Sequence, residues 1–242
     1  MKLQLHQISS RLWYMDNTVE TDRPSLGYIR GDKFAAVVDA GNSPAHYNEF
    51  LALLDEHGLP HPDFCIITHS HWDHTFGLCA LNIPSFACEK TAEHLREEHS
   101  WSFTDPDGQG TAYFNGDACM QAEYASAADI CIALPTATFS DKLTLDLGGV
   151  HAEAIFVGGP HSDDGVIVFV PEEAFIFAGD SSAGNFALPN IAYELPLLDA
   201  YVDVLQSLPF ERFMHAHRPI MTREETFKHL ADGRARGYYT FD

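Results

Sequence analysis

One short segment constrains this chain more than any other: His69-Ser70-His71-Trp72-Asp73-His74. It follows the apolar run 64–68, which predicts a buried strand. Because a strand end can direct alternate side chains at one point, we expect His69 and His71 to share a metal ion. Asp73 and His74 enter the next turn, where they are expected to face a second ion. Imidazole and carboxylate groups are ligands that zinc, iron and manganese accept. The segment therefore predicts a metal centre at the end of a buried strand.

Three more candidate ligands stand at the ends of predicted strands. His161 precedes the apolar run 166–170, Asp180 closes the run 174–180, and His217 follows the strand-like residues 212–216. The residues 171–173 between the first two runs predict a hairpin turn. A lone histidine in such a place is more often structural. Several strand-end sites in one chain favour a metal centre instead, with His215 as a competitor of His217 for the last position.

The order of these residues resembles the metallo-β-lactamase superfamily, from about Gly27 to Ile220. The resemblance implies an α/β fold, the αβ/βα four-layer sandwich of that superfamily. It further implies that one metal is bound by His69, His71 and His161 and the other by Asp73, His74 and His217. Asp180 and a hydroxide would bridge the two metals. Asp39 matches the acidic residue behind the ligands and is expected to orient a ligand or loop by hydrogen bonding.

The final ligand is assigned to His217 because the segment 216–220 is similar to the superfamily's small-His-x-Pro-aliphatic ending. Ala216 and Arg218 stand where that ending usually has glycines. Two other departures narrow the expected function. The zinc β-lactamases commonly have cysteine or serine in place of Asp180, and many lack the ligand at His74. The metal motif is similar to that of glyoxalase II, whose helical C-terminal domain is not expected here because only 25 residues follow His217.

The ligand set predicts a metal-dependent hydrolase. A hydroxide held between two divalent metals would attack a small-molecule ester, thioester or lactone, and Asp73 and Asp180 are assigned catalytic roles as ligands of those metals. Zinc is the favoured metal, with iron or manganese as alternatives. One alternative function is that of a sulfur (persulfide) dioxygenase with a single iron. Enzymes of that class also resemble this superfamily. A metal-binding protein without turnover is the other alternative.

Composition agrees with an enzyme that acts on small molecules. The formal net charge of −21 repels phosphate backbones, so neither DNA nor RNA is expected as a partner. No apolar run reaches membrane-spanning length. The five cysteines are scattered without a C-x-x-C spacing, which predicts reduced thiols and a cytoplasmic location. The sequence predicts no particular oligomeric state.

The length fits a single domain over residues 1–242. Helices are predicted to begin at Pro44 and Pro196, near Thr91, and after the capping box Thr222–Glu225. The segment at about 100–140 is the least regular and carries several aromatic residues. It is interpreted either as a lid over the metal site or as a helical embellishment whose aromatic side chains pack on the core. The loop 181–194, with Phe186, Asn190 and Tyr193, is expected to contact the substrate.

Overall fold

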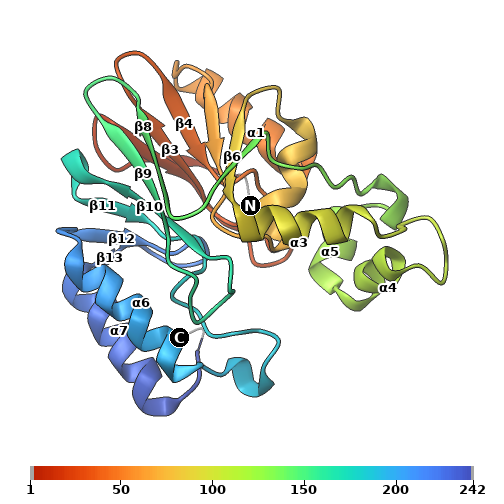
Figure 1. Ribbon diagram of the computed structural model, residues 1–242. Coiled ribbons are helices and arrows are strands. Elements are labelled where there is room, and N and C mark those ends of the chain that lie inside the picture. Colours follow the sequence, from red (N-terminus) through yellow and green to blue (C-terminus); the bar gives the residue numbers. More distant parts are fainter. Residues whose placement is uncertain (1–2, 241–242) are drawn as a thin grey trace.

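A computed structural model describes residues 3–240 of the chain. Two mixed sheets face each other at its centre (Figure 1). The first sheet has the strand order β1-β2-β3-β4-β5-β6-β7. Its strands are β1 (Leu5–Gln7), β2 (Leu12–Met15), β3 (Leu26–Arg30), β4 (Ala35–Val38), β5 (Phe64–Ile66), β6 (Ser85–Cys88) and β7 (Ala137–Phe139).

The second sheet has the order β13-β12-β11-β10-β9-β8. Its strands are β8 (Lys142–Asp146), β9 (His151–Phe156), β10 (Val166–Val170), β11 (Phe175–Phe177), β12 (Arg212–Met214) and β13 (Met221–Thr222). All five residues of β10 are buried, as expected for a strand covered on both faces. The hairpin between β10 and β11 turns through the short 3₁₀ helix η3 (Pro171–Glu173), which confirms the predicted turn.

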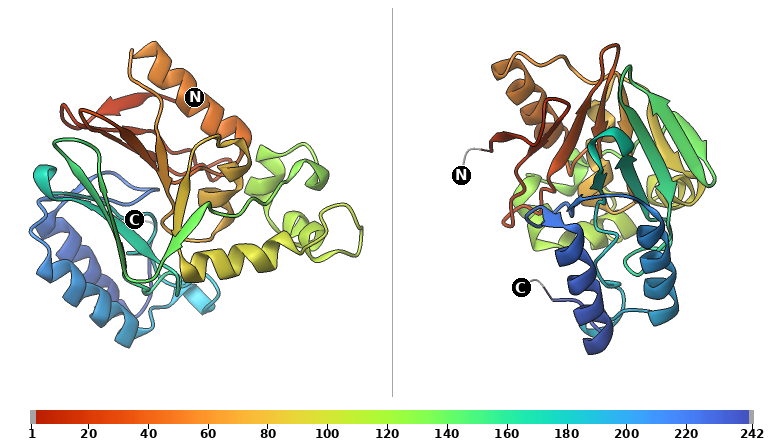
Figure 2. Two further views of the ribbon diagram at one scale, coloured as in Figure 1. Left: turned by 45° about the horizontal axis from the view of Figure 1, so that its top comes forward. Right: turned by 90° about the vertical axis from the view of Figure 1, so that its left-hand side faces the viewer.

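Helices cover the outer face of each sheet, so the predicted four-layer sandwich is confirmed (Figures 1 and 2). The helices α1 (Pro44–Glu56) and α3 (Glu89–His99) lie beside the first sheet, and α6 (Leu195–Ser207) and α7 (Arg223–Arg236) lie against the second. One apolar core lies between the sheets, and two more lie under the helices. No helix within residues 3–240 is long and apolar enough to cross a membrane.

Local sequence signals explain where these helices begin. The hydroxyl of Ser43 accepts a hydrogen bond from the His46 amide at 3.0 Å, and Pro44 occupies the first turn of α1. Thr222 and Glu225 form the predicted capping box of α7. The apolar stripe of α6 buries Leu198, Tyr201 and Leu205 against the second sheet. The predicted helix near Thr91 begins two residues earlier, at Glu89.

Strand direction places the candidate ligands together. The strands β4, β5 and β6 run parallel, and so do β11 and β12. Parallel strands end at the same edge of a sheet, so the residues that follow β4, β5, β11 and β12 meet there. Gly179 allows the two edges to approach: its φ is +51°, and a Cβ at this position would lie 2.3 Å from the Thr68 hydroxyl oxygen.

The irregular segment between α3 and β7 forms an outlying helical lobe (Figure 1). It contains α4 (Gln109–Gly116), α5 (Ala118–Glu123) and η2 (Ala127–Asp129). Arg23 fastens this lobe to the body, because its guanidinium lies 2.8 Å from Glu123 on α5 and 2.8 Å from Glu49 on α1. The remaining short helices are α2 (Trp72–Thr75), η1 (Phe76–Ala80) and η4 (Pro189–Ile191).

Candidate metal centre

The three histidines predicted for the first metal form one compact group. The ligand nitrogens of His69, His71 and His161 all lie within 4.8 Å of one another. His161 Nε2 is 3.0 Å from His71 Nδ1, and His161 Nδ1 donates a hydrogen bond to the Gly184 carbonyl at 3.0 Å. That bond fixes the tautomer of His161, so that the lone pair of Nε2 faces the group.

The second group gathers Asp73, His74, Asp180 and His217, again with ligand atoms within 4.8 Å. Asp73 Oδ2 lies 3.0 Å from Nε2 of His217 and 3.0 Å from Nε2 of His74. Asp73 and His74 come from the short helix α2, which begins six residues after the last residue of β5.

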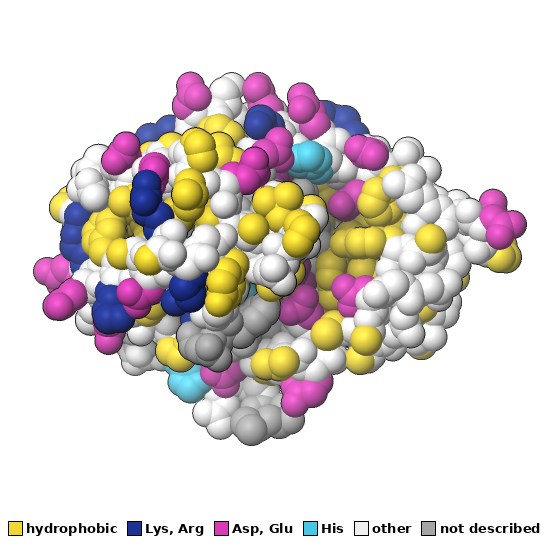
Figure 3. Space-filling model, turned by 90° about the horizontal axis from the view of Figure 1, so that it is seen from below, with side chains coloured by type: hydrophobic (Ala, Val, Ile, Leu, Met, Phe, Trp, Pro, Cys, Tyr) yellow, Lys and Arg dark blue, Asp and Glu magenta, His cyan; other side chains and the backbone are white. Residues whose placement is uncertain are grey.

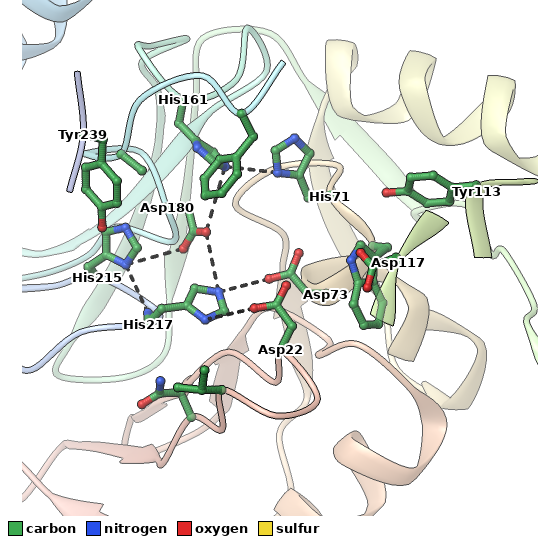
Figure 4. Close-up of a pocket in the computed structure, with 15 residues that line it drawn as sticks. Asp22, His71, Asp73, Tyr113, Asp117, His161, Asp180, His215, His217 and Tyr239 are labelled. Atoms are coloured by element: carbon green, nitrogen blue, oxygen red, sulfur yellow. Dashed lines mark hydrogen bonds and ion pairs between the residues drawn. The ribbon is translucent and has the colours of Figure 1, made fainter. Parts of the chain in front are cut away.

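Asp180 stands between the two groups (Figure 4). Its Oδ2 is 3.9 Å from His161 Nε2 in the first group and 3.5 Å from His217 Nε2 in the second. Its Oδ1 is 3.6 Å from His74 Nε2. One carboxylate therefore reaches histidines of both groups, which is the placement that the predicted bridging role requires.

Asp39 lies behind both groups, in direct contact with the second and linked to the first through Thr68. Its Oδ2 accepts a hydrogen bond from His74 Nδ1 at 2.7 Å and another from the Thr68 hydroxyl at 2.9 Å. Since this hydroxyl is a donor to Asp39, it can accept the Nδ1 proton of His69, 3.1 Å away. Both histidines thus present Nε2 to the centre. Asp39 holds this position with a φ of +67°, a strained conformation for a residue with a side chain.

The donor set fits divalent metal ions. The buried atoms His69 Nε2, His74 Nε2 and Asp180 Oδ1 have no hydrogen-bond partner among the described residues. Unpaired buried polar atoms are costly, and these three belong to the two ligand groups. Imidazole nitrogens combined with carboxylate oxygens suit zinc, iron or manganese.

His215 is close to the centre but lies outside both ligand groups. Its Nδ1 accepts a hydrogen bond from the backbone amide of His217 at 3.0 Å, so this nitrogen has no lone pair left for a metal. Its ring stacks on Tyr239, with ring centroids 6.2 Å apart and an interplanar angle of 15°. This arrangement favours His217 as the ligand.

The protonation of the two groups differs. Burial lowers the pKa of His161 to about 4 and that of His69 well below its usual value, so these two ligands of the first group are neutral. Burial also acts on His217, but the carboxylates of Asp180 and Asp73 outweigh it and raise the pKa of His217 to about 9. Burial also acts on His74, but the carboxylates of Asp73, Asp39 and Asp180 outweigh it and raise the pKa of His74 well above its usual value. Without a metal, the second group therefore holds protons on both histidines at neutral pH.

This difference predicts pH-dependent metal loading. In this range a metal must displace the protons of both His217 and His74, so the affinity of the second group should rise by at least about tenfold per pH unit between pH 6 and 8. His161 and His69 add no such dependence to the first group, because both are already neutral in this range. Competition between the metal-free protein and a chromophoric zinc chelator would measure both affinities. Equal, pH-independent affinities for the two ions would contradict this assignment.

A third group, His94, Asp163 and Asp164, does not fit a metal as well. Asp164 Oδ2 accepts hydrogen bonds from the Ser70 amide at 2.8 Å and the Thr91 hydroxyl at 2.9 Å. Asp163 pairs with Lys90 at 3.2 Å and with His94 at 2.8 Å. These oxygens already have partners, so the group is structural.

A cavity of about 340 Å³ opens onto the metal centre. His71, Asp73, His161, Asp180 and His217 line its inner end (Figure 4). The sequence did not identify five other lining residues, Asn17, Val19, Asp22, Asp117 and Tyr239. They come from an N-terminal loop, the helical lobe and the chain end, and no motif in the sequence connects these segments to the metal site.

The aromatic residues of the segment 100–140 support both interpretations of it, a lid over the metal site and an embellishment packed on the core. Tyr113 lines the cavity, whereas Phe103 is buried and packs on Phe76 at a ring-centroid distance of 6.3 Å. In the loop 181–194, Phe186 lines the cavity, 5.4 Å from the His161 ring. Tyr193 is instead buried, and its hydroxyl donates to the Ser182 carbonyl. Asn190 is not among the lining residues, so of the three residues named for this loop only Phe186 has the expected position, and Ala183 lines the cavity beside it.

Comparisons with known proteins agree with the fold. The family model described as the metallo-beta-lactamase superfamily matches residues 22–208. A metallo-beta-lactamase from Pontibacter korlensis has a similar structure, with a TM-score of 0.66, 20% identity, and coverage of 95% of this chain and 97% of that one. Structures of TMB-1 and of the DIM-1 metallo-beta-lactamase give TM-scores of 0.69 and 0.67 at 16% and 17% identity, each with 98% of both chains covered. No curated protein matches by sequence.

Two facing sheets with His/Asp clusters at one edge, together with the family match, define a metallo-hydrolase of the αβ/βα type. The family match covers most of the chain, and the chain belongs to the metallo-beta-lactamase superfamily.

Proposed function

We propose that this protein hydrolyses a small-molecule ester, thioester or lactone with two divalent metal ions, zinc being favoured over iron and manganese. One observation carries the proposal: Asp180 lies between two complete ligand groups at the inner end of a cavity. Bound metals at such a site activate water as a nucleophile and polarise the bond that it attacks.

The residues of the chain have distinct roles in this proposal. His69, His71 and His161 would hold one ion, Asp73, His74 and His217 the other, and Asp180 both. Asp39 keeps His74 and, through Thr68, His69 in the orientation that ligation needs. A small molecule suits the cavity volume of about 340 Å³. The net charge of −21 argues against nucleic acid as the substrate.

The second ligand group separates this proposal from the alternatives. A persulfide dioxygenase with one iron needs only one set of ligands, whereas four further candidate ligands gather here: Asp73, His74, Asp180 and His217. The cavity that reaches both groups favours turnover over mere metal binding. The cysteines in the described structure are all unpaired thiols, which supports our proposal of a reducing, cytoplasmic location.

A substrate panel tests the proposal. Zinc-loaded and manganese-loaded protein, kept free of oxygen, should hydrolyse at least one of a chromogenic ester, a thioester and a lactone, and should act poorly on a phosphodiester. A cephalosporin serves as the comparison for β-lactam hydrolysis. Inertness toward the whole panel, together with oxygen consumption by the iron-loaded protein on a persulfide, would establish the dioxygenase instead.

A further inference from the structure

The outer walls of the cavity are aromatic. Trp72, Tyr113 and Phe186 all line it, and they come from α2, the helical lobe and the loop after Asp180. The side chain of Phe186 remains half exposed, so this wall faces the entrance. Aromatic faces bind apolar groups and attract cations through the negative charge of the ring face.

The charged side chains on these walls are carboxylates. Asp22 and Asp117 line the cavity in addition to the candidate ligands, and within residues 3–240 no Lys or Arg does. Figure 3 shows a hollow with hydrophobic and acidic side chains along its walls. Two arginine side chains near the cavity contact other residues instead. Arg23 forms ion pairs with Glu123 and Glu49, and Arg218 lies over the ring of Tyr239.

Bound metals would not reverse this charge balance. Two divalent ions add four positive charges. Five carboxylates surround them in the centre and on the cavity walls: Asp22, Asp39, Asp73, Asp117 and Asp180. Asp117 is the one in the helical lobe, away from the ligands. Its Oδ1 accepts a hydrogen bond of 2.8 Å from the Met120 amide at the start of α5.

From these walls we infer the substrate class: a molecule whose hydrolysed bond is joined to a positively charged, apolar group such as a substituted ammonium, with Asp117 selecting for that charge. The inference rests on the proposed hydrolase function. A substrate carboxylate would meet acidic walls and find no lysine or arginine there, whereas an ammonium group would meet both carboxylates and aromatic faces.

Three aryl esters of the same shape test the selectivity. They carry a trimethylammonium, a tert-butyl or a carboxylate group at the same position. For the zinc-loaded protein we expect kcat/KM to be about tenfold higher for the cationic ester than for its neutral isostere, and lowest for the anionic ester. A neutral isostere that is cleaved as well as the cationic ester would overturn the inference.

Asp117→Asn isolates the residue responsible. Asparagine can still cap α5, so the fold should persist while the charge is lost. The ratio of kcat/KM between the cationic and neutral esters should fall by about tenfold in this variant. Asp203→Asn is the matched control: it removes the same charge from an exposed position on α6, outside the cavity lining, and should leave the ratio unchanged. If the ratio of kcat/KM between the cationic and neutral esters is the same in both variants, Asp117 does not select for the charge.

Binding of a cation that cannot be hydrolysed separates this inference from the proposed function. Calorimetry with benzyltrimethylammonium should show binding to the zinc-loaded protein that weakens by about tenfold in Asp117→Asn and is unchanged in Asp203→Asn. If this holds while none of the esters is cleaved, the hydrolase proposal fails and the cation site stands. If the esters are cleaved but the cation does not bind, the charge selection fails and the hydrolase proposal stands.

Discussion

Asp73→Asn should lower kcat/KM for ester hydrolysis by roughly a thousandfold or more, equivalent to about 4 kcal/mol of transition-state stabilisation. Asp73 Oδ2 contacts both His74 and His217 at 3.0 Å, so it is the centre of the second ligand group. The amide is a weaker ligand and removes a negative charge from a buried site. His69, His71 and His161 are untouched and should still hold one ion. Metal analysis of the purified variant, alongside its kinetics, checks both expectations.

Asp163→Asn is the control for this experiment. Asp163 also belongs to a group of potential ligands, but its oxygens pair with Lys90 and His94 and its side chain is 57% exposed. This variant should keep two metals and its activity. Full hydrolytic activity in Asp73→Asn would refute the two-metal mechanism even if the protein is a hydrolase.

His217→Ala should lose one metal and most of the activity, whereas His215→Ala should keep both metals. His217 Nε2 points at Asp73 and Asp180, at 3.0 and 3.5 Å. His215 Nδ1 is instead occupied by the backbone amide of His217. Inductively coupled plasma analysis of the two variants, prepared in parallel, compares their metal content directly. Loss of a metal from the His215 variant alone would mean that the final loop has been misassigned.

Much of the site was predictable because its residues are close in sequence or stand at strand ends. The segment 69–74 carries four potential ligands, and the buried strand before it fixes where they point. The ends of β11 and β12 supply Asp180 and His217 in the same way. Ligand chemistry leaves few residue types to choose from, and hence the short motifs identify these positions.

The cavity walls were not predictable by the same reasoning. Along the sequence, most strands of the first sheet stand between Asp22 and Asp117. Tertiary contacts such as that of Arg23 with Glu123 bring the two residues to the same cavity. The support given by Asp39 was expected, but its link to His69 through the Thr68 hydroxyl depends on side-chain geometry. Tertiary packing determines which aromatic side chains of the segment 100–140 line the cavity: Tyr113 faces the cavity, whereas Phe103 packs in the core.

The number of metals bound per chain tests the central claim most directly. Metal-free protein dialysed against excess zinc at pH 8, and then separated from unbound ions, should contain close to two zinc ions per chain. At this pH the proton that His217 holds is displaced more readily than at neutral pH. Manganese loading under the same conditions should give the same ratio. A ratio that stays at one per chain with both metals would contradict the placement of Asp180 between two ions.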